Sequence, residues 1–233
     1  MNIQFANDYH AVVTLRFGKT FKDAITARNI QSCIKHIDSA KMNLTERARL
    51  YTASFPDYPE LSVSKGWLTG VWMIGNFYRN KSRYYGAYPH SYLKRIKSMF
   101  PDCKTILHLF SGSLTKEDVG NEIRFDINNQ YDPTIVGDAY KLSKYFEDHF
   151  DLILADPPYS NEDAKQYGTA MINRNEVVKE CVKILNPNGF LVWLDQVYPM
   201  YRKSELRLVG TIGLIRSTNH RVRMVFIFQK QLA

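Results

Sequence analysis

Four consecutive residues, Asp156-Pro157-Pro158-Tyr159, combine groups that could hold an amino nitrogen for reaction. They directly follow the apolar run Leu152–Ala155, which predicts a buried strand, and two prolines with fixed φ angles end that strand in a rigid loop. The Asp156 carboxylate and the Pro157 carbonyl can accept the two hydrogens of an exocyclic amine, while the Tyr159 ring stacks on the heterocycle. The alternative is a proline-terminated strand with a surface acid.

The sequence around this loop predicts strands that alternate with helices. We expect strands over 105–110, 122–126, 134–136, 151–155 and 190–194, helices over 91–100, 140–150 and 176–185, and a closing pair of strands over 206–216 and 222–229. Such alternation predicts an α/β fold whose sheet is mostly parallel, with an antiparallel pair at its end. Ligands of such sheets bind beyond the carboxyl ends of the strands, which is where Asp156 falls.

The first ninety residues are less regular. Helices are expected over 21–38 and 43–51, the second with Asn43 as its cap and Glu46 three residues later. A loop is expected over 55–66, followed by an aromatic-rich stretch. We therefore expect a basic, aromatic-rich N-terminal region over 1–90 and a second domain over 91–233.

Composition limits the classes of protein to which the chain can belong. Of its 233 residues, 45% are hydrophobic and 23% charged, as in ordinary globular domains. Residues 1–100 carry 15 basic and 6 acidic side chains, against 16 and 17 in residues 101–233. The excess positive charge indicates either a polyanionic partner or a solubilising surface. No apolar run is long enough to span a membrane, no signal-peptide pattern begins the chain, and three scattered cysteines suit the cytoplasm.

Several chemistries lack their residues. Methylation at a ring carbon of cytosine uses a cysteine after a proline, and no Pro-Cys pair occurs in the sequence. The phosphate-loop pattern is missing as well. The six histidines have no paired spacing, so no metal is expected, and His108 inside an apolar run is expected to be a core histidine.

On these residues the chain resembles the S-adenosylmethionine-dependent amino-methyltransferases of adenine N6 or cytosine N4. The tetrapeptide Asp156–Tyr159 resembles their catalytic loop, and residues 107–113 (Leu-His-Leu-Phe-Ser-Gly-Ser) resemble their first cofactor motif. The resemblance covers residues 104–230. It implies a Rossmann-like class I methyltransferase sheet, mostly parallel with a C-terminal antiparallel hairpin, in residues 91–233. It also implies that the basic, partly helical N-terminal region serves target recognition and closes over the cofactor as a lid.

The resemblance also implies a set of site residues. The catalytic group is Asp156, Pro157, Pro158 and Tyr159. S-adenosyl-L-methionine would be held by Tyr88, Pro89, Phe110, Ser111, Gly112, Asp126, Asp138, Ala139 and Asp156. Tyr159, Asn219 and His220 would contact the substrate. The chain departs from the family at Leu114, where a second glycine is usual, and its helices after the first two strands must be short or absent.

The implied function is methyl transfer to the N6 amine of adenine in DNA, since Asp at the first loop position leans toward adenine. Adenine N6 in RNA, cytosine N4 in DNA and a non-catalytic nucleic-acid-binding subunit remain open alternatives. A small-molecule or protein-glutamine methyltransferase usually has Asn at that position. A homodimer is open to the chain, and its compact size suits a phage or mobile-element enzyme by analogy.

Overall fold

The computed structural model describes strand residues 2–7, 10–14 and 20–21, and residues 42–75, 88–89, 91–217 and 222–232 with their side chains. The chain divides into two compact units, Met1–Lys41 and Met42–Ala233. In the first unit, β1 (Asn2–Asn7), β2 (His10–Thr14) and β3 (Thr20–Phe21) pair as an antiparallel sheet. The helix expected over 21–38 lies almost wholly outside the described residues.

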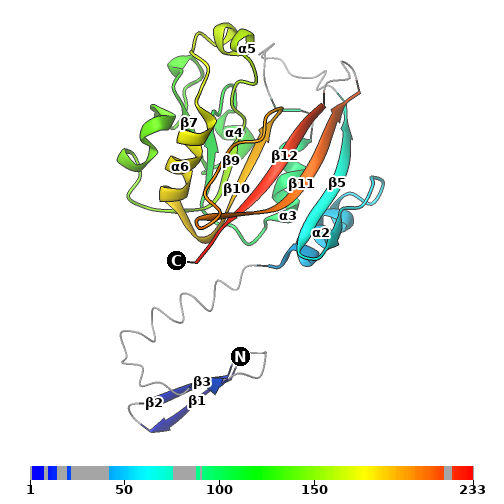
Figure 1. The fold of residues 1–233 in the computed structure, drawn as a ribbon, viewed down its shortest axis with the longest axis vertical. Coiled ribbons are helices and arrows are strands. Elements are labelled where there is room, and N and C mark those ends of the chain that lie inside the picture. Colours follow the sequence, from blue (N-terminus) through cyan, green and yellow to red (C-terminus); the bar gives the residue numbers. More distant parts are fainter. Residues whose placement is uncertain are drawn as a thin grey trace. The chain divides into compact units, whose positions relative to one another are not determined.

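The second unit is built on a nine-stranded sheet with the order β4-β5-β11-β12-β10-β9-β6-β7-β8 (Figure 1). Neighbours from β8 to β10 are parallel, whereas β12 is antiparallel to both β10 and β11. The strands are β4 (Ser62–Ser64), β5 (Trp67–Ile74), β6 (Ile106–Leu109), β7 (Ile123–Asp126), β8 (Ile135–Val136), β9 (Phe150–Ala155), β10 (Leu185–Asp195), β11 (Leu206–Arg216) and β12 (Val222–Lys230). This confirms the predicted α/β sheet, mostly parallel with a C-terminal antiparallel hairpin.

Helices pack on both faces of this sheet. They are α2 (Leu44–Ser54), α3 (Tyr92–Met99), α4 (Lys116–Val119), α5 (Asn161–Gln166) and α6 (Arg174–Ile184), with the 3₁₀ helices η1 (Asn129–Tyr131) and η2 (Ala139–Lys144). The predicted capping box starts α2, with Asn43 and Glu46 bonding each other's backbone N–H groups at 3.0 Å. No helix in the described part of the chain has the length and apolar composition that a bilayer crossing requires.

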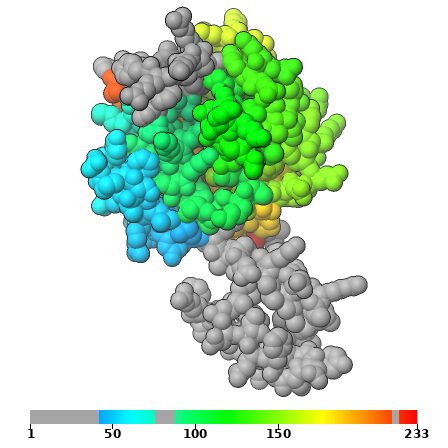
Figure 2. Space-filling model, turned by 180° about the vertical axis from the view of Figure 1, so that it is seen from behind, coloured from blue at the N-terminus to red at the C-terminus, as the bar shows by residue number. Residues whose placement is uncertain are grey.

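Two apolar cores lie on opposite faces of the sheet, because the central strands are apolar on both sides. One joins α2 and α3 to β5 and to alternate residues of β9–β12, including Leu152 and Leu154. The other joins α6 and η2 to the remaining faces, including Ile153 and Ala155. Figure 2 shows the α2 and α3 side of the molecule, in blue to teal. Because the strands from β8 to β10 are parallel, their carboxyl ends lie along the same edge of the sheet.

The structure differs from the sequence predictions in the first hundred residues. The loop expected over 55–66 contains β4, and the aromatic stretch after it begins with β5, which pairs with β11 in parallel. The division expected at residue 90 therefore does not match the two units, since β4 and β5 belong to the main sheet. The helix expected over 140–150 is the short η2, because the backbone leaves helical angles at Lys141 (φ −134°).

Candidate active site

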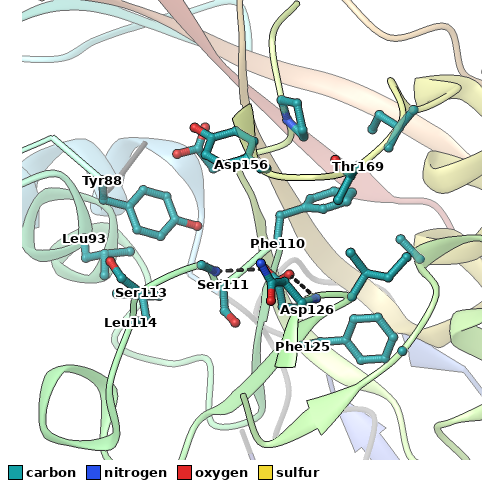
Figure 3. Close-up of a pocket in the computed structure, with 18 of the residues that line it drawn as sticks. Tyr88, Leu93, Phe110, Ser111, Ser113, Leu114, Phe125, Asp126, Asp156 and Thr169 are labelled. Carbon is teal, nitrogen blue, oxygen red and sulfur yellow. Dashed lines mark hydrogen bonds between the residues drawn. The ribbon is translucent and has the colours of Figure 1, made fainter. Parts of the chain in front are cut away.

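A cavity of about 540 Å³ lies at the carboxyl ends of β6, β7, β8 and β9. Its size is within the roughly 300–1,000 Å³ typical of small-molecule sites. The residues expected to bind a cofactor all line it: Tyr88, Pro89, Phe110, Ser111, Gly112, Asp126, Asp138, Ala139 and Asp156. Figure 3 shows Asp156 and Asp126 at two ends of this cavity, with the Tyr88 ring pointing into the space between them.

The turn after β6 is held against the end of β7 by backbone contacts. Phe110 and Gly112 both have positive φ angles, 61° and 50°, a region that glycine enters most easily. The Ser111 N–H donates to the Phe125 carbonyl at 3.2 Å, and the Gly112 N–H donates to Asp126 Oδ2 at 2.8 Å. The turn thus brings bare backbone to the wall of the cavity.

Asp126 ends β7, and backbone N–H groups bind both of its carboxylate oxygens. Oδ2 accepts from Gly112 and Oδ1 accepts from Asn128, each at 2.8 Å. Burial raises the pKa of this carboxyl above its ordinary value, although both hydrogen bonds act to lower it. Each oxygen keeps a second lone pair, so the carboxylate can also accept hydroxyl groups from a ligand.

Asp138 lies at the start of η2 and is held by its own loop. Its Oδ1 accepts the Tyr140 N–H at 2.9 Å, and its Oδ2 pairs with Lys141 at 3.3 Å. The preceding Gly137 has no room for a side chain, because an added Cβ would lie 2.5 Å from Phe125 Cζ. This close packing sets Asp138 in the cavity wall.

Asp156 follows β9 directly and stands where the cavity meets the tetrapeptide loop. Asp156 and Pro158 line the cavity, whereas Tyr159 is not among the lining residues. The Tyr159 hydroxyl instead donates to Asp156 Oδ1. Burial raises the pKa of Asp156 to about 7, although the charge of Arg223 and the Tyr159 hydrogen bond both act to lower it. Near neutral pH this carboxyl is therefore divided between its accepting and its protonated form.

Tyr88 reaches the cavity from the segment before α3. Its ring stacks on Tyr92, with centroids 5.1 Å apart and planes at 15°. Its hydroxyl is buried and has no hydrogen-bond partner among the residues that the structure describes. Burial, and next the nearby charge of Asp156, raise the pKa of Tyr88 well above its ordinary value, so the group stays a neutral donor. A buried hydroxyl of this kind is costly unless a ligand satisfies it.

An ion pair behind the tetrapeptide loop escaped the sequence analysis. Arg174 Nε lies 2.6 Å from Asp195 Oδ2, and Arg174 Nη2 donates to the Tyr159 carbonyl at 3.2 Å. Asp195 is fully buried and also accepts from the Trp193 indole at 3.1 Å and from the next two backbone N–H groups. The one feature of the sequence that could have indicated this pair is Asp195, an acid at the end of the apolar strand β10.

The structure also settles where the remaining predicted residues fall. Leu114, which stands at the family's second glycine, lines the cavity, as do residues 91–94 and 169–172, which no motif indicated. Asn219 and His220 lie outside the described residues, as do residues 84–87 and His90 of the segment around Tyr88.

His108 lies fully buried within β6. Its Nε2 is 2.6 Å from Glu122 Oε2, which also pairs with Lys97 at 2.7 Å. Burial lowers the pKa of His108, against the raising effect of Glu122. Within the described ranges, no group of three or more His, Cys, Asp or Glu side chains could hold a metal ion.

Comparison with known proteins adds little beyond this geometry. No protein-family model matches the sequence, and no curated protein matches it. Solved structures similar to it include TrmN from Thermus thermophilus (15% identity, TM-score 0.39, covering 54% of this chain and 43% of that one). A second is the N-methyltransferase NodS from Bradyrhizobium japonicum WM9 in complex with S-adenosyl-L-homocysteine (11% identity, TM-score 0.41, covering 55% of this chain and 78% of that one). A third is an rRNA methylase from Streptococcus thermophilus (10% identity, TM-score 0.38, covering 55% of this chain and 88% of that one). The chain thus spans less than half the length of TrmN, and at these identities its function must be argued from its own residues.

Proposed function

We propose that this protein transfers a methyl group from S-adenosyl-L-methionine to an exocyclic amino nitrogen of a nucleic-acid base, with adenine N6 in DNA as the first candidate. The observation that carries the proposal is the position of Asp156. This carboxyl follows a central parallel strand and stands between a cavity of small-molecule size and the Pro-Pro-Tyr loop. A methyl donor on one side and an amine on the other would meet there.

The residues of the cavity fit the cofactor in chemical type. Asp126, with free lone pairs on both oxygens, would accept the ribose hydroxyls, and Asp138 would accept the adenine amine. The Tyr88 hydroxyl, which has no partner in the described part of the chain, would donate to the cofactor, and its ring suits a neighbouring cation. When bound, S-adenosyl-L-methionine supplies a methyl group activated by a sulfonium.

The protein must make a poor nucleophile competent, because the lone pair of an aromatic amine is spread into its ring. Asp156 and the Pro157 carbonyl would accept the two amine hydrogens and so concentrate the lone pair on nitrogen. A hydrogen bond to a charged acceptor contributes roughly 1.5–3 kcal/mol. With a pKa of about 7, the same carboxyl can take the proton that the methylated nitrogen must lose. No covalent bond to the enzyme is needed.

A base in a duplex is hidden in the stack and has to be extruded, which costs a few kcal/mol. Stacking on Tyr159 would return about 1–3 kcal/mol of this. The same chemistry would serve adenine in RNA or cytosine N4, so the site alone leaves the polymer and the base open. A non-catalytic subunit would not need the intact tetrapeptide, and this favours an enzyme.

Methyl transfer is tested by incubating the protein with labelled S-adenosylmethionine and either DNA or RNA, followed by digestion to nucleosides. We expect labelled N6-methyl-2′-deoxyadenosine from DNA, while N4-methyl-2′-deoxycytidine, or label in RNA only, would support the alternatives. Asp156→Ala should abolish transfer and leave cofactor binding largely intact, because the cavity walls remain. Asp148→Ala removes an exposed acid before β9 and serves as the matched control. Wild-type turnover by Asp156→Ala would refute the assignment.

A further inference from the structure

Arg223 on β12 is a buried cation beside the proposed reaction centre. The residue is 6% exposed, and its guanidinium carbon lies 4.3 Å from the centre of the Tyr159 ring. That distance is well within the range of cation–π attraction. The hairpin strand is thereby tied to the side chain on which the target base is proposed to stack.

The burial of Arg223 is unlike that of the other buried arginines. Arg47 is paired with Asp102, both of its contacts being 2.7 Å long, and Arg95 donates to the Tyr51 hydroxyl at 2.7 Å. Arg223 is different because the contact that its guanidinium makes among the described residues is with the Tyr159 ring; its Nε, like that of Arg47, is buried there without a hydrogen-bond partner. Burying a cation without a carboxylate partner lowers stability, so its presence at this position calls for a role.

The charge of Arg223 acts on Asp156 across the loop. It is the strongest influence opposing burial, which raises the pKa of Asp156. The other groups that face Asp156 are Tyr159 in its own loop, Asp195 at the end of β10, Asp163 in α5, and Tyr88 and Tyr92 at the start of α3. Asp195 and Asp163 are negative, and Arg174 already balances Asp195. Within the described part of the chain, Arg223 is thus the main cation acting on Asp156.

We infer that Arg223 is a positioning residue of the substrate side: its guanidinium fixes the Tyr159 ring and keeps the Asp156 carboxyl in its ionised, accepting form. This inference rests on the proposed function. Since Tyr159 donates to Asp156 and its ring lies against the Arg223 guanidinium, the three side chains form one connected unit. An incoming amine would then meet an acceptor whose ionised form Arg223 favours against the effect of burial.

Two neutral variants, Arg223→Met and Arg223→Gln, test the charge, and Arg223→Lys keeps the charge without the planar stack. Arg207→Met, an exposed arginine on the neighbouring strand β11, is the matched control. The readouts are the pH profile of single-turnover methyl transfer and the carboxyl-carbon NMR titration of Asp156, assigned by its loss in Asp156→Asn. The second readout does not depend on activity.

For the wild type and the control, we expect both midpoints near 7, as for Asp156 itself. In the neutral variants both should move upward by about one pH unit, which lowers the rate near neutral pH up to about tenfold and restores it at higher pH. Arg223→Lys should keep its midpoint close to that of the wild type.

An equal loss of rate at every pH, with the Asp156 titration unchanged in both neutral variants, would overturn the inference while leaving methyl transfer intact. A wild-type protein that methylates neither DNA nor RNA would overturn the proposed function, and the role of Arg223 would fall with it.

Discussion

At the scale of single residues, Asp126 and Asp156 show how different hydrogen-bond partners suit two buried acids to different roles. Burial raises the pKa of both. Asp126 accepts two backbone N–H groups that belong to the fold, whereas Asp156 accepts a hydroxyl that can turn away. Asp126 is therefore suited to hold a ligand in a fixed place, and Asp156 is suited to exchange its partner and its proton.

The titration of Asp156 predicts how Asp156→Asn changes stability with pH. The carboxyl titrates near about 4 in the unfolded chain and at about 7 in the folded protein. Between these values the folded protein holds more protons, so its stability falls as pH rises. Asparagine does not titrate, so the free energy of unfolding of the variant should rise relative to that of the wild type as pH increases across this window. The expected relative gain is roughly 1–3 kcal/mol for a partly buried carboxyl. Urea unfolding at about pH 4 and about pH 8 measures the gain; an equal difference at both would contradict it.

The Tyr88 hydroxyl supports a second prediction at this scale. Because this buried group has no partner in the described part of the chain, Tyr88→Phe should leave the stability of the free protein unchanged or slightly higher. Binding of S-adenosylhomocysteine should weaken by roughly threefold to tenfold, the value of one neutral hydrogen bond. Calorimetric titration measures this. Tyr198→Phe, at an exposed tyrosine that does not line the cavity, is the control; undiminished binding by Tyr88→Phe would remove Tyr88 from the cofactor site.

At the scale of elements, the pair Arg174–Asp195 joins the start of α6 to the end of β10 and to the tetrapeptide loop. Arg174→Met would leave Asp195 buried without its cation, and breaking such a pair typically costs about 3–5 kcal/mol. We expect that loss in urea unfolding, together with a lower kcat, because the Tyr159 carbonyl loses its donor. Arg202→Met, which breaks only an exposed pair with Glu205, is the control. Unchanged stability of Arg174→Met would show that the pair does not hold the loop.

The same elements show what the sequence could predict. The strands of the second half were placed to within a few residues, because β9 and β10 are apolar runs that end in acids or prolines. The strand β5 was missed although Leu68, Trp72 and Ile74 alternate with exposed residues, since it lies in a stretch that was described only as rich in aromatics. The contacts of Arg174 and Arg223 with the tetrapeptide loop could not be foreseen, although Arg223 flanks the hairpin tip expected to face the base, because each acts on a loop far from it in sequence. Such pairings depend on the order of strands in the sheet, which no local pattern contains.

At the scale of the whole molecule, the basic charge of the first hundred residues divides into two kinds. The Arg47 guanidinium packs against the adjoining rings of Phe100 and Phe190, 4.7 and 4.6 Å from their centres, and the residue is fully buried. Arg95 is also buried and lies 4.0 Å from the centre of the Tyr58 ring. These two stabilise the core around α2 and α3 and are not free to contact phosphate. Exposed cations such as Arg49 and Lys65 remain available to a polyanion.

Salt dependence decides whether that exposed charge binds nucleic acid. Each phosphate contact releases counterions, so the logarithm of the binding constant should fall linearly with the logarithm of salt, by about 0.9 per contact on duplex DNA. For the full wild-type chain we expect the binding constant to fall steeply as salt rises. Arg49→Gln or Lys65→Gln should reduce the slope of that salt dependence by about one if the replaced side chain contacts a phosphate. Arg207→Gln, from the half of the chain without excess charge, should keep the wild-type slope. Fluorescence anisotropy with a labelled duplex at several salt concentrations measures all four proteins. A binding constant that does not change with salt would indicate that the basic charge serves solubility. Methylation would then require recognition of the base without ionic contacts to the phosphate backbone.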